Sequence, residues 1–374
     1  MTDAIADANA IDGFVEELLN EFCAVGRNGV AAWRPSVSGI EFIIAPKFLI
    51  LQNAHKSDRI VIGPRRIDGP DFETLLEILD ARPIELGVGN LVELPSDHPV
   101  LRRIEKLVRK HSIIQTPQRA AALFDIVGFS LLSAIKQVAQ LNSLECSIST
   151  AYKRVADLGL TLDITRSNTG DGFYVWNHDQ GLAADLALYY VTILALCENA
   201  LERERDTAGL APVVRTCIHL GGHYSCYQMG RLAPTDRDYI VGELTITLAR
   251  MSEVALPGQI LLGDFTRRPD DGKDRTIGPS NFVSEGTAFF ERLKGTNLSG
   301  QRVAQIKTYL TGDQVDDGRF YVDKLNFKDK HDRSVSAFNA KANLYRVDGE
   351  AIFLGLQHAR LTSDFTIEHL GVVS

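Results

Sequence analysis

The segment Phe124-Asp125-Ile126-Val127-Gly128-Phe129-Ser130 constrains the fold more than any other part of this sequence. Residues 121–127 are almost wholly apolar, which predicts a buried strand, and Gly128 predicts a tight turn into a helix. Because an unpaired buried carboxylate is costly, Asp125 needs a cation, a cluster of donors or access to solvent. Asp125 is therefore either a cap for the next helix or part of a site, and the segment alone favours neither.

A second aspartate, Asp171, lies between two further predicted strands, 160–166 and 172–176, in the run Thr169-Gly170-Asp171-Gly172. Gly-Asp-Gly between strands is typical of a hairpin turn, which is the structural alternative to a functional role. If the two strand ends are neighbours, the two carboxylates repel each other unless cations bridge them. Two Mg²⁺ or Mn²⁺ ions there could hold a triphosphate and activate an attacking oxygen.

The periodicity of apolar residues predicts alternating strands and helices along most of the chain. The predicted helices are 11–22, 70–79, 99–110, 131–158, 183–205 and 242–255. The predicted strands are 41–45, 48–52, 59–63, 121–127, 160–166, 172–176, 213–220, 223–228, 259–262, 306–310 and 351–356. From residue 121 to 262 the order is β-α-β-β-α-β-β-α-β, which predicts an α+β sandwich whose antiparallel-rich sheet is covered by helices.

The predicted helix 99–110 has a basic face. That face is either exposed to solvent or a binding surface for an anionic partner.

Composition bounds the class of partner and the location. The chain has 374 residues, a net charge of -8 and a pI of about 5.6, which argues against a nucleic-acid partner held by phosphate contacts. Five scattered cysteines without a C-x-x-C pair argue against disulfides and zinc and favour a reducing cytoplasm. The acidic start MTDAIADANA does not resemble a signal peptide, and the apolar run 186–197 is shorter than a bilayer span of ~20 residues. We therefore expect a cytoplasmic protein without a membrane anchor.

Together the two aspartate segments resemble the catalytic domain of class III adenylate and guanylate cyclases, which has a ferredoxin-like, palm-type fold. Asp125 and Asp171 match its two metal-binding aspartates, and the carbonyl of Ile126 matches a further metal ligand. Four later blocks continue the resemblance in the family's order, so that it covers roughly residues 115–312: Arg215-Thr216-Cys217-Ile218-His219, 242–251, Pro257-Gly258-Gln259-Ile260, and Glu291-Arg292-Leu293-Lys294-Gly295 with 306–310.

The resemblance implies a reaction and roles for further residues. The ribose 3′-oxygen of a nucleoside triphosphate attacks the α-phosphate, and pyrophosphate leaves, with two Mg²⁺ or Mn²⁺ ions bound. Gly128, Phe129 and Ser130 would contact phosphates, and Lys294 is a further candidate for the terminal phosphates. Arg250 would come from a partner subunit and stabilise charge on the reacting phosphate. An active enzyme is then a homodimer with composite sites.

Three positions depart from the purine cyclases. Ile246 stands where the family has an asparagine that orients the ribose. Ser167, flanked by Arg166, and Tyr239 stand at the base-reading positions. This pattern resembles the bacterial pyrimidine cyclases of the Pycsar antiphage systems, which make cyclic UMP or cyclic CMP for a cyclic-nucleotide-binding effector. The alternatives are a purine cyclase with unusual base contacts and a degenerate, binding-only cyclase fold.

The resemblance also predicts a division of the chain into three regions. Residues 1–114 would be an accessory region for regulation or dimerisation, because they carry no recognisable chemistry. Residues 115–312 would be the nucleotidyl cyclase domain. Residues 313–374 would be a C-terminal extension that packs on it.

Overall fold

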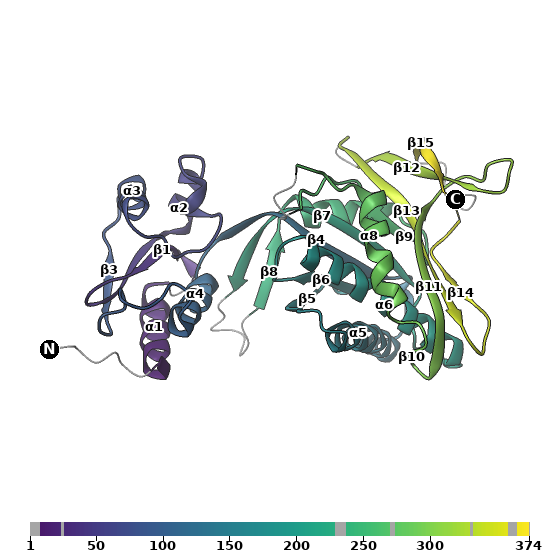
Figure 1. Cartoon of the computed structure of the whole chain (residues 1–374), viewed down its shortest axis with the longest axis horizontal. Helices are drawn as coiled ribbons and strands as arrows, with labels where there is room; N and C mark the ends of the chain where they lie inside the picture. Colours follow the sequence, from purple (N-terminus) through teal and green to yellow (C-terminus); the bar gives the residue numbers. More distant parts are fainter. Residues whose placement is uncertain are drawn as a thin grey trace. The chain divides into compact units, whose positions relative to one another are not determined.

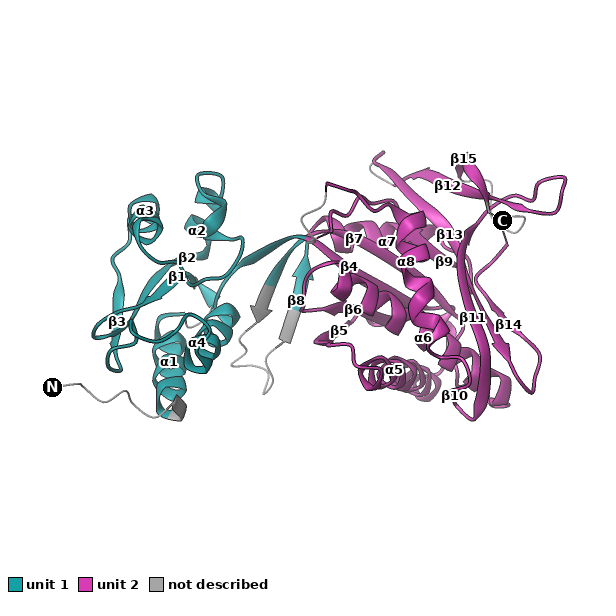
Figure 2. Cartoon of the chain, viewed as in Figure 1, with its two compact units in different colours: residues 1–117, 223–241 teal, residues 118–222, 242–374 magenta. Residues whose placement is uncertain are grey.

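The computed structural model describes residues 8–23, 26–228, 237–269, 274–329, 332–357 and 365–373 (Figure 1). The chain forms two compact units (Figure 2). Unit 1 comprises residues 1–117 and 223–241, and unit 2 comprises residues 118–222 and 242–374.

Unit 1 is a small antiparallel sheet with helices on both faces. Its sheet has the order β1-β2-β3, from Asn28–Pro35, Gly39–Pro46 and Ile84–Gly87. One face packs on α1 (Ala8–Phe22) and α4 (Pro99–Lys110), and the other packs on α2 (Lys47–Asn53) and α3 (Pro70–Leu79). Strand β1 contributes to both faces: Val30 and Trp33 lie in one apolar cluster and Ala31 and Ala32 in the other, because a β-bulge between Val30 and Ala32 interrupts the strict alternation.

Two of the predicted strands in unit 1 were wrong. Residues 48–52 lie in α2, where Ile50 is buried while Phe48 and Leu51 are exposed, the one-sided pattern of a short helix. Residues 59 and 60 lie in the 3₁₀ turn Asp58–Ile60, and Ile62 forms only an isolated bridge with Gln115. A short apolar run does not separate a strand from a helix, and here the tertiary contacts decide. The helices α3 and α4, each with proline at the first position, were predicted correctly.

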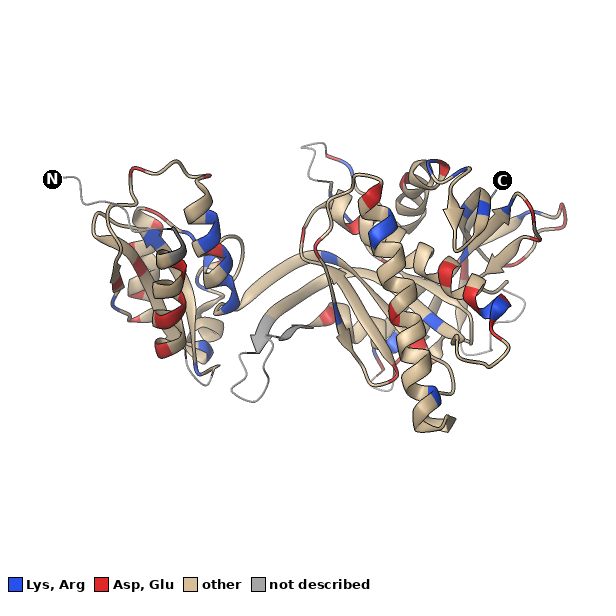
Figure 3. Ribbon diagram, turned by 90° about the horizontal axis from the view of Figure 1, so that it is seen from below, with Lys and Arg blue, Asp and Glu red and all other residues tan. Residues whose placement is uncertain are grey.

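The basic residues of α4 are partly neutralised inside unit 1. Arg103 forms an ion pair with Asp12 of α1, and Arg109 Nη1 lies 3.8 Å from Glu105 Oε1, one turn earlier in α4. Figure 3 shows acidic and basic residues distributed over both units. These contacts favour an ordinary solvated surface for the basic face of α4 over a binding surface for an anionic partner.

Unit 2 contains the long sheet, in the order β10-β11-β13-β9-β7-β4-β6-β5. In chain order these strands are β4 (Ile114–Ile126), β5 (Ile164–Asn168), β6 (Gly172–Asn177), β7 (Val214–Gln228), β9 (Ile260–Gly263), β10 (Asn297–Leu298), β11 (Gln301–Thr311) and β13 (Ser334–Arg346). The neighbours β7 and β9 run parallel, whereas β4 with β6, β5 with β6, and β13 with β9 run antiparallel. The predicted α+β fold, with an antiparallel-rich sheet covered by helices, is confirmed.

Helices cover one face of this sheet with the main apolar core (Figure 1). They are α5 (Ala134–Asp157), α6 (Leu182–Arg205) and α8 (Pro279–Glu291). Phe124 and Ile126 point into this core, so that Asp125 between them points to the opposite face. On that face lies α7 (Glu243–Val254), where Tyr174 of β6 donates a hydrogen bond to the carbonyl of Thr245 at 3.2 Å.

Helix α6 is long and apolar enough to cross a membrane by length and composition, but 83% of its apolar window is buried inside the protein. Tyr190 of α6 stacks on Phe289 of α8 with ring centroids 3.9 Å apart. A core helix of a folded unit has this combination of apolar character and burial.

The compact units divide the chain at different places from the three predicted regions. Residues 223–228 of β7 and their partner strand β8 (Arg237–Val241) belong to unit 1, although the sequence assigned them to residues 115–312. Strand β13 pairs with both β9 and β11, so residues from the predicted extension 313–374 form a central strand of unit 2. Strand β12 (Phe320–Lys328) pairs with β13 and with β15 (Thr366–Val373). The roles assigned to the three regions stay predictions.

Replacing Gly172 with alanine is expected to destabilise unit 2 by about 3 kcal/mol or more, since a Cβ there would lie 1.8 Å from the carbonyl oxygen of Phe124. Gly278→Ala is the control, because its Cβ would meet nothing closer than 4.0 Å, and the change from glycine to alanine at the N-cap of α8 costs only about 0.5 to 1 kcal/mol. Urea unfolding followed by the fluorescence of buried Trp176, in a Trp33→Phe background, measures both. Equal midpoints for the two variants would show that β4 and β6 can separate without cost.

Candidate active site

The structure brings Asp125, Ile126 and Asp171 together. Asp125 lies opposite Gly172 in the antiparallel pairing of β4 with β6, and the N–H of Ile126 donates to the carbonyl of Asp171 at 2.8 Å. The side chain of Asp125 is 14% exposed, and Asp171 is exposed in the turn that joins β5 to β6. The absence of a side chain at Gly172 permits this close approach of the two strands.

Arg215 completes this cluster from a third strand, β7. Its Nη1 donates to Asp125 Oδ2 at 2.6 Å. Sequence reasoning assigned Arg215 no role, although it lies in one of the blocks that carry the resemblance. One feature of the sequence could have pointed to Arg215. It is a cationic residue at the start of a predicted strand that is mostly apolar and follows the two aspartate segments.

The pKa of Asp125 is raised from its ordinary value. Burial of the carboxyl group is the main cause, and the negative charge of Asp171 raises it further. Hydrogen bonds from Arg215 and from Ser252 of α7 act in the opposite direction without cancelling the effect. Two aspartates lie here beside the single guanidinium of Arg215, so an additional cation is favoured.

The chemistry of these residues fits a divalent cation that shares its ligands with a substrate. Carboxylate and carbonyl oxygens are the ligands that Mg²⁺ and Mn²⁺ prefer. Within the described residues, however, no group of three or more His, Cys, Asp or Glu side chains could hold a metal ion. Because Mg²⁺ is commonly held by one or two carboxylates plus substrate phosphates, Asp125 and Asp171 suffice only when a phosphorylated ligand is present.

The turn after β4 differs in detail from the prediction. Phe129–Leu131 form a 3₁₀ turn, and α5 begins at Ala134 rather than directly after the glycine. Gly128 takes a left-handed conformation with φ 69°, which glycine adopts without strain. Among the described residues, the backbone N–H groups of Gly128, Phe129 and Ser130 have no hydrogen-bond partner, so they are available to an anion.

The two neighbouring residues predicted to read the base separate onto opposite faces of the sheet. Ser167 pairs with Tyr174, which shares the face of Asp125, so the structure brings Ser167 to the site's face. Arg166 points to the helix-covered face, where it forms an ion pair with Glu145 of α5. Within one copy of the chain the alternation of β5 therefore directs Arg166 away from the face of Asp125, and its assignment to base recognition stays a prediction.

Arg250 does not reach the aspartates of its own chain. It lies on α7 two residues before Ser252, which contacts Asp125, and two residues correspond to about 200° around a helix. Its guanidinium instead makes ion pairs with Glu253 at 2.7 Å and with the buried carboxylate of Asp329 at 3.2 Å. One turn before Arg250, Ile246 is 47% exposed.

The remaining two candidates lie elsewhere. Lys294 follows α8, where its neighbour Arg292 donates to the carbonyl of Leu158 just past the end of α5. Asp125 lies near the beginning of that 24-residue helix, which is about 36 Å long, so the structure does not bring Lys294 to the pair. Tyr239 lies on β8 in unit 1, opposite Cys226, and is partly exposed.

No family model and no curated protein matches this sequence. Solved structures with a similar fold include the adenylyl cyclase CyaB from P. aeruginosa, with 14% identity and a TM-score of 0.34 over 45% of this chain and 93% of that one. The guanylyl cyclase Cya2 has 14% identity and a TM-score of 0.38 over 60% and 92% of the two chains. The guanylate cyclase domain of RhGC from Catenaria anguillulae has 13% identity and a TM-score of 0.37 over 61% and 98%. At such scores the likeness carries no argument about activity, which has to come from the site.

Asp125→Asn is expected to stabilise unit 2 at neutral pH, since the charged wild-type carboxylate is disfavoured by burial. The raised folded-state pKa makes the wild type lose stability as pH rises through that pKa. The gain of the variant is thus present at pH 7 and vanishes below about pH 4, where the unfolded aspartate is protonated. Urea unfolding at several pH values measures it, with exposed Asp157→Asn as control. A variant less stable than wild type at pH 7 would contradict the assigned balance between burial and Arg215.

Proposed function

We propose that this chain is a metal-dependent nucleotidyl cyclase, which converts a nucleoside triphosphate to a 3′,5′-cyclic nucleotide and pyrophosphate. The observation that carries the proposal is the juxtaposition of Asp125 and Asp171 across β4 and β6, with the guanidinium of Arg215 on Asp125. Two acidic oxygen donors beside a fixed cation suit a metal-bound triphosphate. Neither a helix cap nor a simple hairpin turn requires the two carboxylates to meet.

The residues of the chain supply positioning and charge. Asp125, Asp171 and the carbonyl of Ile126 would hold divalent ions, which lower the pKa of the ribose 3′-hydroxyl and offset the charge of the triphosphate. Arg215 can donate to phosphate oxygens beside Asp125, and the N–H groups of the turn at Gly128 can donate to others. The 3′-hydroxyl loses its proton to solvent, its oxygen forms a bond to the α-phosphorus, and the bond from that phosphorus to the α,β-bridging oxygen breaks, so that pyrophosphate leaves.

The proposed substrate is a pyrimidine nucleotide, UTP or CTP. The small, neutral Ser167 lies on the face of Asp125, where a purine cyclase would have a lysine or a glutamate. Arg166 is directed away from that face, so it does not replace such a residue in the same chain. Tyr239 stays the candidate for packing on a base. A purine substrate remains the alternative, since the family resemblance does not depend on these positions.

The proposed assembly is a homodimer with composite sites. Arg250 points away from the aspartates of its own chain, which is the arrangement expected if it serves a second copy. Its contact with Asp329 fixes the guanidinium from the C-terminal part of unit 2. In the setting of the Pycsar resemblance, the product would be a cytoplasmic antiphage messenger for a separate cyclic-nucleotide-binding effector.

Purified protein incubated with each of ATP, GTP, UTP and CTP and with Mn²⁺ is expected to form cyclic UMP or cyclic CMP, with one pyrophosphate per product. Asp125→Ala and Asp171→Ala should each reduce the rate by about a thousandfold, whereas exposed Asp157→Ala should not. Conversion of ATP or GTP alone would overturn the pyrimidine assignment. No conversion of any nucleotide would overturn the cyclase and leave the binding-only alternative, which the exposed Ile246 motivates.

Composite sites predict complementation between two inactive variants. Asp125→Ala and Arg250→Gln should each be inactive alone, but mixed and re-associated they form dimers that contain one intact site. The mixture should regain up to about a quarter of the wild-type rate, as expected for random pairing in a two-fold dimer. No recovery in a sample whose mixed dimers are verified by differently tagged subunits would show that Arg250 does not act across the interface.

A further inference from the structure

Arg250 is paired with a carboxylate from outside the predicted cyclase region. Strand β12 ends at Lys328 and β13 begins at Ser334, and Asp329 lies in the loop between them. Its Oδ2 lies 3.2 Å from Arg250 Nε, and the two side chains are only 3% and 15% exposed. The contact is an ion pair rather than a directed hydrogen bond, because Nε makes no hydrogen bond of proper geometry. Water screens charges weakly at such burial, so the attraction between the two groups is retained.

The loop fixes the carboxylate of Asp329. Its Oδ1 accepts a hydrogen bond from the N–H of Arg333 at 2.9 Å. Two backbone hydrogen bonds close the loop, from the N–H of Asp329 to the carbonyl of Arg333 at 2.9 Å and from the N–H of Asp332 to the carbonyl of Asp329 at 3.0 Å. Strand β13 in turn pairs with β9, β11 and β14 (Ile352–Leu354). One carboxylate oxygen is therefore tied to the loop, and the other faces Arg250.

The guanidinium of Arg250 keeps one nitrogen open to solvent. Nη1 donates to both carboxylate oxygens of Glu253 at 2.7 and 2.9 Å, and Nε faces Asp329. Among the described residues Nη2 has no partner, and it is not one of their buried unpaired atoms, so its two N–H groups reach solvent. Because the guanidinium is planar, holding Nε and Nη1 sets the direction in which Nη2 points.

We propose that Asp329 is a positioning residue for Arg250 in the cyclisation reaction, an inference that rests on the proposed function. The ion pair holds the side chain so that Nη2 is presented to the reacting phosphate of a nucleotide bound to the aspartates of a second copy. An arginine that is not held would lose rotamer freedom each time it meets the phosphate, and the fold removes that cost in advance. A residue from the C-terminal part of the chain thereby contributes to the chemistry.

The opposite role for Asp329 would be to block Arg250 until the contact is released. A blocking carboxylate would cover the N–H groups that a phosphate uses, as in a bidentate ion pair. Asp329 leaves Nη2 uncovered, and Glu253 contacts Nη1 alone. The geometry therefore favours positioning over a block.

Steady-state kinetics of the full chain, with the nucleotide that the wild type converts best, test this role. Asp329→Asn keeps the shape of the side chain and the acceptor for the loop but removes the charge. It should lower kcat by about tenfold or more and change KM by less than about twofold, since Arg250 acts on the reacting phosphate. Asp332→Asn is the matched control, because Asp332 is an exposed aspartate of the same loop, paired with Lys328, and should leave kcat unchanged.

A second background separates positioning from a merely structural role. In the slower Arg250→Lys enzyme, Asp329→Asn should lower kcat by less than about twofold, because lysine has no Nε–H for Asp329 to hold. A structural role would lower kcat by the same factor in both backgrounds.

Hydrogen exchange follows Arg250 itself, without any turnover. In protein with isotopically labelled arginine, the Nε–H resonance of Arg250 is identified by its loss in Arg250→Lys. This N–H should exchange with water at least about tenfold faster in Asp329→Asn than in wild type, because the side chain is no longer held in its buried position. Asp332→Asn should leave the exchange rate unchanged.

Equal kcat for Asp329→Asn and an active wild type overturns the inference, and so does a faster Asp329→Asn enzyme, which would make the contact inhibitory. An equal loss of kcat in both backgrounds, or unchanged exchange of the Nε–H, would show that Asp329 does not act through Arg250. A wild type that converts no nucleotide is a different result, because it overturns the proposed function and this role together.

Discussion

The contact between β4 and β6 at Gly172 is the constraint on which the candidate site depends. Because Gly172 has no side chain, the carbonyl of Phe124 occupies the space of a Cβ, and the two strand ends meet. That approach places Asp171 beside Asp125, whose pKa is raised mainly by burial and further by the charge of Asp171. Arg215 offsets part of this charge from the next strand. Two carboxylates at one strand end repel each other. Such a pair is typical of sites that bind cations.

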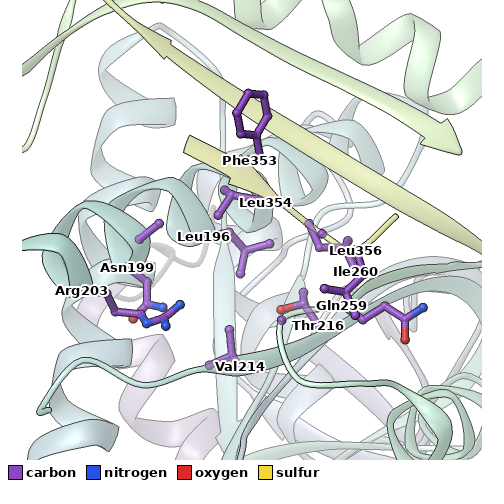
Figure 4. A pocket seen from close by; sticks show the side chains of 13 residues that line it. Leu196, Asn199, Arg203, Val214, Thr216, Gln259, Ile260, Phe353, Leu354 and Leu356 are labelled. Atoms are coloured by element: carbon purple, nitrogen blue, oxygen red, sulfur yellow. The ribbon is translucent and has the colours of Figure 1, made fainter. Parts of the chain in front are cut away.

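The sheet also joins this site to the C-terminal part of the chain. Strand β13 lies between β9 and β11, and the loop that precedes it contributes Asp329 to Arg250. On the opposite face, residues 353–356 line a pocket together with α6 and β7 (Figure 4). Residues beyond 313 are therefore structural parts of unit 2, and the ion pair that holds Arg250 depends on them.

Much of the fold could be predicted from local patterns. The long amphipathic helices and the strands around Asp125 and Asp171 follow from apolar periodicity, and Gly170-Asp171-Gly172 follows from turn chemistry. Strands β12 and β13 were missed, because their alternation is weak and their burial comes from neighbours distant in sequence. Arg215 and Arg166 show the same limit in the site. Their roles depend on which strand face each residue occupies and on Asp125 and Glu145, their charged partners across the fold.

The central claim is that Asp125 and Asp171 hold a divalent cation together with a triphosphate. Electron paramagnetic resonance of Mn²⁺ titrated into the protein, with and without 3′-deoxy-UTP, tests it most directly, because that nucleotide lacks the attacking hydroxyl and stays intact. Tight Mn²⁺ binding is predicted only when the nucleotide is present, and Asp125→Asn or Asp171→Asn should abolish it. Nucleotide-dependent Mn²⁺ binding that survives both substitutions would contradict the account.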